Sequence, residues 1–216
     1  MENSIEQWTQ DPYECPNWEQ GYDLMALRDD RLGKGMLWPD RGFVNNLVRY
    51  IHDNDCTGVS SIGSGRGNLE WLLAEHFDKL AVTCIDVRDL TDFPAPAKWH
   101  CKYGCASNNM IARIQKEDAL LFSFPVPSVP FERYVQYYRG QCIIVIGDSS
   151  CVPFPGNSRE IAKGFLPDWT LAHFEQINGR LTELAAPAFI TVFTRQSENV
   201  SRFKALRKMS SRFSRK

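Results

Sequence analysis

One stretch, residues 59–88, constrains the fold of this chain more than any other. It begins with a short β-favouring run, Val59 to Ile62, and three glycines then follow at alternate positions. Leucines recur at helical spacing after the glycines, and residues 81–87 return to strand composition. This order predicts a strand, a glycine turn, a helix and a second strand, which together form a βαβ half-unit.

The three glycines, Gly63, Gly65 and Gly67, predict a turn that holds a ligand. Glycine lets the backbone turn tightly and approach a ligand closely, and the helix that follows presents unpaired N–H groups to it. Asp86 ends the second strand about twenty residues later, where a carboxylate can accept hydrogen bonds from both hydroxyls of a ribose. We therefore expect a ligand that contains a nucleoside.

The spacing of the glycines distinguishes between nucleoside ligands. A dinucleotide fingerprint requires its third glycine at the position of Asn68, so that pattern fails. The run G-S-G-R-G instead resembles motif I of the class I S-adenosylmethionine-dependent methyltransferases, and Asp86 matches the acidic residue that binds the cosubstrate ribose in that superfamily. Ser61 stands where the superfamily usually has Asp or Glu, and its hydroxyl can still form a hydrogen bond there. A dinucleotide site and a turn that binds nothing remain as alternatives.

The resemblance extends from about residue 40 to about residue 195. It implies an α/β fold with a doubly wound Rossmann-like sheet, mostly parallel with a final antiparallel strand, and helices on both faces. We expect an acidic segment with a candidate lid at Lys34 to Trp38 in residues 1–39, a methyltransferase-like domain at 40–195, and a basic tail at 196–216. The lid residues can equally form a loop that packs in the core.

The remaining elements follow from local patterns. We expect helices over residues 21–32, from the N-cap Asp40 to Ile51, over 108–116, and from Phe131 to a stop at Gly140. Further strands are expected over 98–103, 119–124 and 142–146, with Gly147 and Asp148 ending the last of them. Residues 169–177 and 188–194 also have strand composition, and their short connection predicts antiparallel pairing.

Ligands of such a sheet lie beyond the carboxyl ends of its strands. The expected cosubstrate contacts are Ser61, Gly63, Ser64, Gly65, Gly67 and Asp86, with Ser107 near the base. Ser123, Pro125 and Asp148 are the candidate catalytic residues, because residues 123–127 lie where related amino-methylating enzymes carry a polar residue, two prolines and an aromatic.

Three titratable residues have open roles. Asp148 and His173 are the candidate general bases, although Asp148 can simply cap the next turn and a lone His in such a strand is more often structural. Glu70 can reach the amino group of the cosubstrate or stabilise the start of its helix, and we favour the second role.

Composition places the chain among soluble, single-domain proteins. Its 216 residues are 43% hydrophobic and 24% charged, no apolar run approaches the roughly 20 residues of a membrane span, and the N-terminal segment lacks an apolar signal core. We expect a cytoplasmic location. The seven cysteines are odd in number and lack C-x-x-C spacing, which indicates free thiols. Cys101, Cys105 and His100 resemble half of a zinc site without a second ligand pair, so no metal is predicted.

The function predicted is transfer of a methyl group from S-adenosylmethionine to an N or O acceptor. A catalytically silent binding module of the same fold is the alternative, and a nicotinamide-dependent oxidoreductase is a third possibility. Residues 195–216 carry eight bases and one acid, and an apolar stripe runs through them from Val200 to Phe213. This basic amphipathic tail favours RNA as acceptor, whereas the short chain favours a small molecule. The tail can also be a solvated end or a helix docked on the body.

Overall fold

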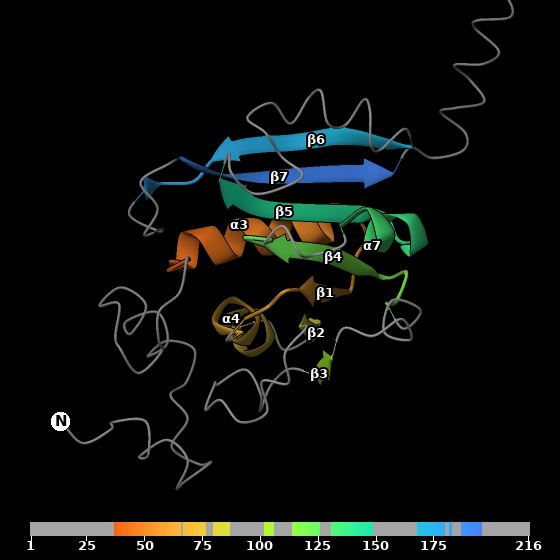
Figure 1. Ribbon diagram of the computed structural model, residues 1–216. Coiled ribbons are helices and arrows are strands. Elements are labelled where there is room, and N and C mark those ends of the chain that lie inside the picture. Colours follow the sequence, from red (N-terminus) through yellow and green to blue (C-terminus); the bar gives the residue numbers. More distant parts are fainter. Residues whose placement is uncertain are drawn as a thin grey trace, which may run out of the picture.

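The computed structural model describes residues 37–65, 67–76, 80–86, 102–105, 114–125, 131–148, 168–179, 182 and 187–195. These residues form a seven-stranded sheet with helices on its two faces (Figure 1). The strands are β1 Gly58–Ile62, β2 Ala81–Asp86, β3 Lys102–Cys105, β4 Asp118–Ser123, β5 Cys142–Asp148, β6 Trp169–Gln176 and β7 Ala188–Arg195. The described helices are α3 Arg41–His52, α4 Asn68–His76 and α7 Phe131–Tyr137.

The strand order is β3-β2-β1-β4-β5-β7-β6. Neighbouring strands from β3 to β5 are parallel, and β7 is antiparallel to both β5 and β6. The predicted doubly wound, mostly parallel sheet with a final antiparallel strand is therefore confirmed. The predicted antiparallel pairing of the last two strands is confirmed as well.

The sheet reverses its direction of winding between β1 and β4. From β1 the chain moves outward to β2 and then β3, whereas from β4 it moves to β5 on the other side. Connections that leave two neighbouring strands in opposite directions open a crevice at their carboxyl ends, and ligands of this fold class bind there. The glycine turn follows β1 directly, so it lies at this crevice.

The core has two layers because side chains alternate between the faces of each strand. In β4 and β5, Leu121 and Ile144 pack with α3 and α4, whereas Leu120 and Ile143 pack with α7. The expectation of helices on both faces is therefore confirmed.

Helix α3 is the clearest local prediction. The Asp40 side chain accepts a hydrogen bond from the Phe43 backbone N–H at 2.7 Å, which is the expected N-cap, and the helix buries an apolar stripe against the sheet. Just before it, Leu37 forms an isolated bridge with Thr182, and Trp38 is 5% exposed. These two residues of the candidate lid therefore belong to the core, while residues 34–36 lie outside the described part.

Three predicted boundaries were wrong. The third strand is Lys102–Cys105 instead of 98–103, with 98–101 outside the described residues. Residues 114–117 are not helical, so the helix expected over 108–116 does not extend to its predicted end. Strand β5 continues through Gly147 and Asp148, because Phe189 and Ala188 of β7 pair with them and extend the ladder. The helix expected at 21–32 and the basic tail lie outside the described residues.

None of the helices in the described ranges is long and apolar enough to cross a membrane.

Candidate functional site

The glycine turn has a backbone that ordinary residues rarely adopt. Gly63, Gly65 and Gly67 have φ angles of 73°, 57° and 75°, all in the left-handed region that favours glycine. The Gly63 N–H donates to the carbonyl of Ile85 at 2.7 Å, which ties the turn to β2, and the Trp71 N–H donates to the carbonyl of Gly67 at 2.8 Å as α4 begins. The glycines at alternate positions are thus explained, because the turn between β1 and α4 needs three residues in the left-handed conformation.

Gly65 is the exposed tip of this turn. A Cβ atom built on it would meet no heavy atom of the described residues within 4 Å, so these residues leave the space beside it open. Its N–H donates to Asp86 Oδ2 at 3.0 Å, from the end of the neighbouring strand. The structure therefore brings together the turn and the carboxylate that the sequence predicted as partners.

Beneath the turn lies a buried pair that the sequence did not predict. Ser61 and Glu70 are 0% and 1% exposed, and the Ser61 hydroxyl donates to Glu70 Oε1 at 2.5 Å. Burial raises the pKa of Glu70 from 4.5 to about 7, and the hydrogen bond from Ser61 opposes that rise. An acid from α4 therefore lies against the strand position where the methyltransferase motif usually has its own acid. Glu70 does lie in the first helical turn, as expected.

Ser64 Oγ and Trp71 Nε1 are buried polar atoms near the turn, and neither has a hydrogen-bond partner within the described ranges. Buried polar groups are nearly always hydrogen-bonded in folded proteins, so each needs an explanation. Ser64 lies in the glycine turn itself, next to the open space at Gly65.

The carboxyl end of β4 carries the predicted acceptor motif and is strained. In the register of the sheet, Ile62 pairs with Phe122, so Ser123 ends β4 beside the start of the glycine turn. Phe124 has a φ angle of 48°, which is rare for a residue other than glycine, and its N–H donates to the carbonyl of Ile146 at 2.7 Å. Such outliers persist only where the surrounding structure enforces them, and they cluster at functional sites. Pro125 follows and is buried.

Asp148 ends β5 at the same edge. It is 9% exposed and lies two residues beyond Ile146, which is the register partner of Ser123. Ser123, Pro125 and Asp148 therefore share the edge of the sheet at which the glycine turn lies. Ser107 lies outside the described residues.

His173 does not join this group, and its contacts fit the structural role that was weighed against its role as a general base. It lies in β6, the outermost strand, and faces α3. Its Nε2 lies 2.6 Å from the Tyr50 hydroxyl and 3.1 Å from Glu175 Oε2. The pairing shifts by one residue between Leu171 and His173, and no pattern in the sequence indicates this bulge.

No group of three or more His, Cys, Asp or Glu side chains among the described residues is arranged to hold a metal ion. Cys56 and Cys142 are buried free thiols, and Cys84 is buried as well.

No protein-family model and no curated protein matches the chain. Solved structures do match. A precorrin-6y C5,15-methyltransferase from Geobacter metallireducens is 12% identical, with a TM-score of 0.52, over 78% of this chain and 96% of that one. The 23S rRNA methyltransferase ErmE is 14% identical, with a TM-score of 0.51, over 76% of this chain and 70% of that one. A third match, Thermoplasma acidophilum 1320, is 18% identical, with a TM-score of 0.51, over 82% of this chain and 98% of that one.

The strand order, the switch point and the similarity to these solved structures indicate the same fold. The chain has the Rossmann-like fold of the class I S-adenosylmethionine-dependent methyltransferases.

Proposed function

We propose that the protein is a methyltransferase that uses S-adenosylmethionine and transfers its methyl group to an N or O acceptor. One observation carries the proposal: the left-handed glycine turn, with Asp86 held at Gly65, lies at the switch point of a sheet with the methyltransferase strand order. The same sequence pattern excludes the third glycine of a dinucleotide site.

In this proposal the residues of the turn hold the cosubstrate. The cosubstrate lies against the open side of Gly65, and the Asp86 carboxylate accepts hydrogen bonds from its ribose. The Ser64 hydroxyl supplies a further contact. Gly63 and Gly67 shape the turn, Ser61 supports it from below through Glu70, and Ser107 is assigned to the base. When bound, the cosubstrate supplies a methyl group activated by its sulfonium.

Ser123, Pro125 and Asp148 are assigned to the acceptor. Transfer of a methyl group is an in-line displacement, so the protein contributes mainly by aligning the two reactants and excluding water. The buried Pro125 and the rigid turn at Phe124 supply walls for that purpose. Asp148 can take the proton when the acceptor must lose one.

Two measurements test the proposal. Titration calorimetry should detect binding of S-adenosylmethionine or its demethylated product, and none of NAD. Incubation with a labelled methyl donor and fractionated cell extract should then move the label into RNA, DNA, protein or small metabolites. Binding without any transfer would favour the alternative, a silent methyltransferase-like module. NAD binding without cosubstrate binding would favour an oxidoreductase.

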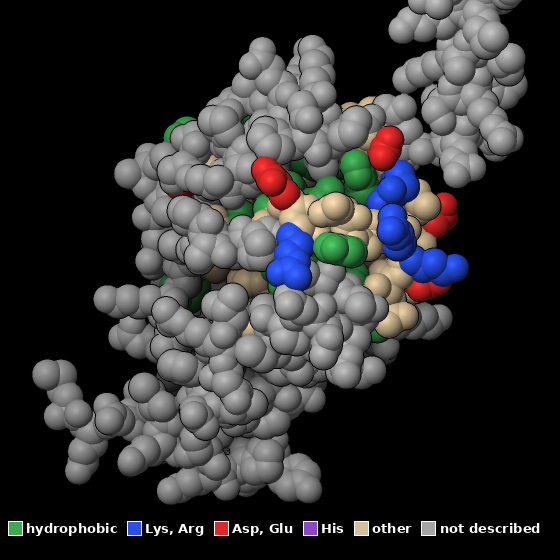
Figure 2. Space-filling model, turned by 45° about the vertical axis from the view of Figure 1, so that its right-hand side comes forward, with side chains coloured by type: hydrophobic (Ala, Val, Ile, Leu, Met, Phe, Trp, Pro, Cys, Tyr) green, Lys and Arg blue, Asp and Glu red, His purple; other side chains and the backbone are tan. Residues whose placement is uncertain are grey.

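The fold does not select the acceptor, because its members include both a 23S rRNA methyltransferase and a precorrin methyltransferase. The basic tail supports RNA as the methyl acceptor. Binding of its Lys and Arg side chains to phosphates would release counterions from the RNA, so RNA affinity would fall steeply as the salt concentration rises. On the face in Figure 2, Lys and Arg side chains of the described residues lie close together at the right, with Asp and Glu side chains beside them. We assign RNA binding, where it occurs, to the tail.

Truncation tests this assignment. Deleting residues 199–216 should flatten the salt dependence of RNA binding and leave cosubstrate affinity unchanged. An identical salt slope after truncation, or no RNA binding at low salt, would point to a small-molecule acceptor.

A further inference from the structure

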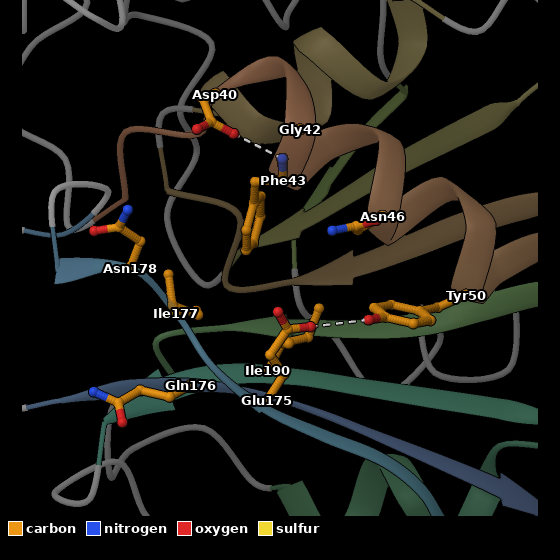
Figure 3. A pocket seen from close by; sticks show the side chains of 10 residues that line it. All are labelled: Asp40, Gly42, Phe43, Asn46, Tyr50, Glu175, Gln176, Ile177, Asn178 and Ile190. Atoms are coloured by element: carbon orange, nitrogen blue, oxygen red, sulfur yellow. Dashed lines mark hydrogen bonds between the residues drawn. The ribbon is translucent and has the colours of Figure 1, made fainter.

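A second pocket lies between α3 and the edge of the sheet, away from the glycine turn. It has a volume of about 240 Å³ and is lined by residues of α3 and its N-cap, by the end of β6, and by Ile190 of β7. Figure 3 shows Phe43, Asn46 and Tyr50 on α3 facing Glu175 and Ile177 across this space. Three strand spacings separate β7 from β1, or about 14 Å at about 4.8 Å each, so the pocket is distinct from the cosubstrate site.

A β-bulge aims two polar side chains at this pocket side of the sheet. Leu171 pairs with Phe193 and packs on the α7 face, but the register then shifts so that His173 pairs with Val192 and Glu175 with Ile190. Val192 and Ile190 belong to the core on the α3 face. With regular alternation, positions 173 and 175 would lie on the α7 face together with Leu171. The extra residue of the bulge places both side chains on the α3 face instead.

The two re-aimed side chains meet Tyr50. The Tyr50 hydroxyl donates to Glu175 Oε2 at 3.1 Å and lies 2.6 Å from His173 Nε2, while the two rings lie 4.4 Å apart. His173 and Glu175 are themselves 3.1 Å apart. The contacts that Glu175 makes with Tyr50 and His173 both use Oε2, so within the described residues Oε1 is not engaged in a hydrogen bond. The cluster holds a carboxylate in a fixed orientation at the wall of the pocket.

The lining has the chemistry of a site for an organic cation. Among the described residues that line it, the ionisable groups are Tyr50 and two carboxylates, Asp40 and Glu175, with no Lys, Arg or His. Phe43 supplies an aromatic ring, which attracts an ammonium group through its π-face, and the side chains of Asn46 and Gln176 supply amide oxygens. The Tyr50 ring already lies against the His173 ring. Arg49 lies over the Tyr50 ring at 5.3 Å and does not line the pocket.

We propose that this pocket is a second binding site, for a small ligand that carries an organic ammonium group, with Glu175 as its counter-ion. The carboxylate stays charged at neutral pH, since hydrogen bonds from His173 and Tyr50 lower the pKa of Glu175. The pocket has room for about eight non-hydrogen atoms, at about 30 Å³ for each group the size of a water molecule. The proposal is independent of methyl transfer.

The test uses n-butylammonium as the probe and n-butanol as its uncharged counterpart. Both are titrated into the full-length protein while the backbone amide signals of Asn46, Tyr50 and Gln176 are followed by NMR. We expect saturable shifts with n-butylammonium and at least about tenfold weaker binding of n-butanol. Equal affinity for the two probes, or no saturable shift at these amides, would overturn the proposal.

Variants locate the charge. Glu175→Gln should weaken n-butylammonium binding at least about tenfold, whereas Glu132→Gln, an exposed acid on the opposite face, should leave it unchanged. Asp86→Ala should also leave it unchanged, which separates this site from the glycine turn. Wild-type affinity in Glu175→Gln would show that the carboxylate does not bind the cation. Because Glu175 is more than half exposed, its replacement should not disturb the fold.

Discussion

Two glutamates in this molecule have pKa values shifted in opposite directions. Glu70, beneath the glycine turn, is 1% exposed, and burial raises its pKa to about 7. Glu175, at the pocket beside α3, has a side chain 52% exposed, and its hydrogen bond from His173 lowers its pKa. The first acid is held away from solvent and largely protonated below neutral pH, whereas the second presents a charge to solvent.

This difference separates a supporting role from a binding role. The buried Glu70 carboxyl bonds Ser61 beneath the turn, whereas the contacts proposed for the cosubstrate are those of Gly65, Ser64 and Asp86. An exposed carboxylate oriented by a tyrosine and a histidine can meet a ligand directly. The variants below test whether the two regions are as independent as this comparison requires.

The largest effect is expected at the tip of the glycine turn. Gly65→Val places a side chain in the open space that the cosubstrate would occupy, so affinity should fall by at least about 100-fold, or about 3 kcal/mol. The left-handed backbone adds a folding cost of roughly 1–2 kcal/mol, which the fold should tolerate. Titration calorimetry and circular dichroism measure the two effects.

Gly179→Val is the matched control, because a Cβ there also meets no atom within 4 Å and no left-handed φ is required. It should bind the cosubstrate as the wild type does. Normal binding by the Gly65 variant would remove the turn from the cosubstrate site.

The second effect concerns Glu70 and the pH dependence of stability. The pKa of Glu70 is raised from 4.5 to about 7 in the folded state, so its contribution is complete below pH 4.5 and is lost as pH rises to 7. The loss amounts to about 3 kcal/mol, at about 1.4 kcal/mol for each pH unit. Glu70→Gln keeps an acceptor for Ser61 and should abolish this loss.

Urea unfolding at several pH values measures the difference between the two proteins. The Gln variant should match the wild type near pH 4.5 and exceed its free energy of unfolding by about 3 kcal/mol at pH 8. Glu132→Gln, which changes an exposed acid, is the control and should follow the wild-type curve. Parallel curves for wild type and Glu70→Gln would mean that Glu70 ionises normally.

A third and smaller effect is expected at Asp86. Replacing it with alanine removes the proposed acceptor of the ribose hydroxyls, which should cost about 1.5–3 kcal/mol, or roughly 10- to 100-fold in affinity. Asp86→Asn retains one acceptor oxygen and should lose less. Calorimetry on the three proteins checks the order, and unchanged affinity in Asp86→Ala would contradict the ribose assignment.

The glycine turn could be predicted from the sequence because its signals are local. Gly65 and Asp86 are 21 residues apart, within one βαβ unit, and the glycine spacing reports the left-handed backbone directly. The buried strands β4 and β5 could likewise be predicted from continuous apolar runs, which are typical of a parallel sheet covered on both faces.

The pocket beside α3 could not be predicted in the same way. Tyr50 and His173 are 123 residues apart, and they meet only because β6 folds to the edge of the sheet over α3. The bulge that aims His173 and Glu175 depends on how β6 pairs with β7, which periodicity within β6 does not report. The strain at Phe124 similarly arises from its contact with β5.

The smallest effect is expected from Tyr50→Phe, which tests whether the pocket region is separate from the turn. The variant loses the hydroxyl that contacts His173 and Glu175 and keeps the buried ring, so the free energy of unfolding should fall by about 1 kcal/mol. For a chain of this length that corresponds to a fall of about 2–4 °C in Tm. Tyr137→Phe, at a tyrosine 54% exposed, should change Tm by much less. Cosubstrate affinity should stay at the wild-type value in both variants, because β7, which lines the pocket, is three strand spacings, or about 14 Å, from β1. A loss of cosubstrate affinity in Tyr50→Phe alone would show that the two regions are coupled through α3, since this helix packs against α4 below the glycine turn.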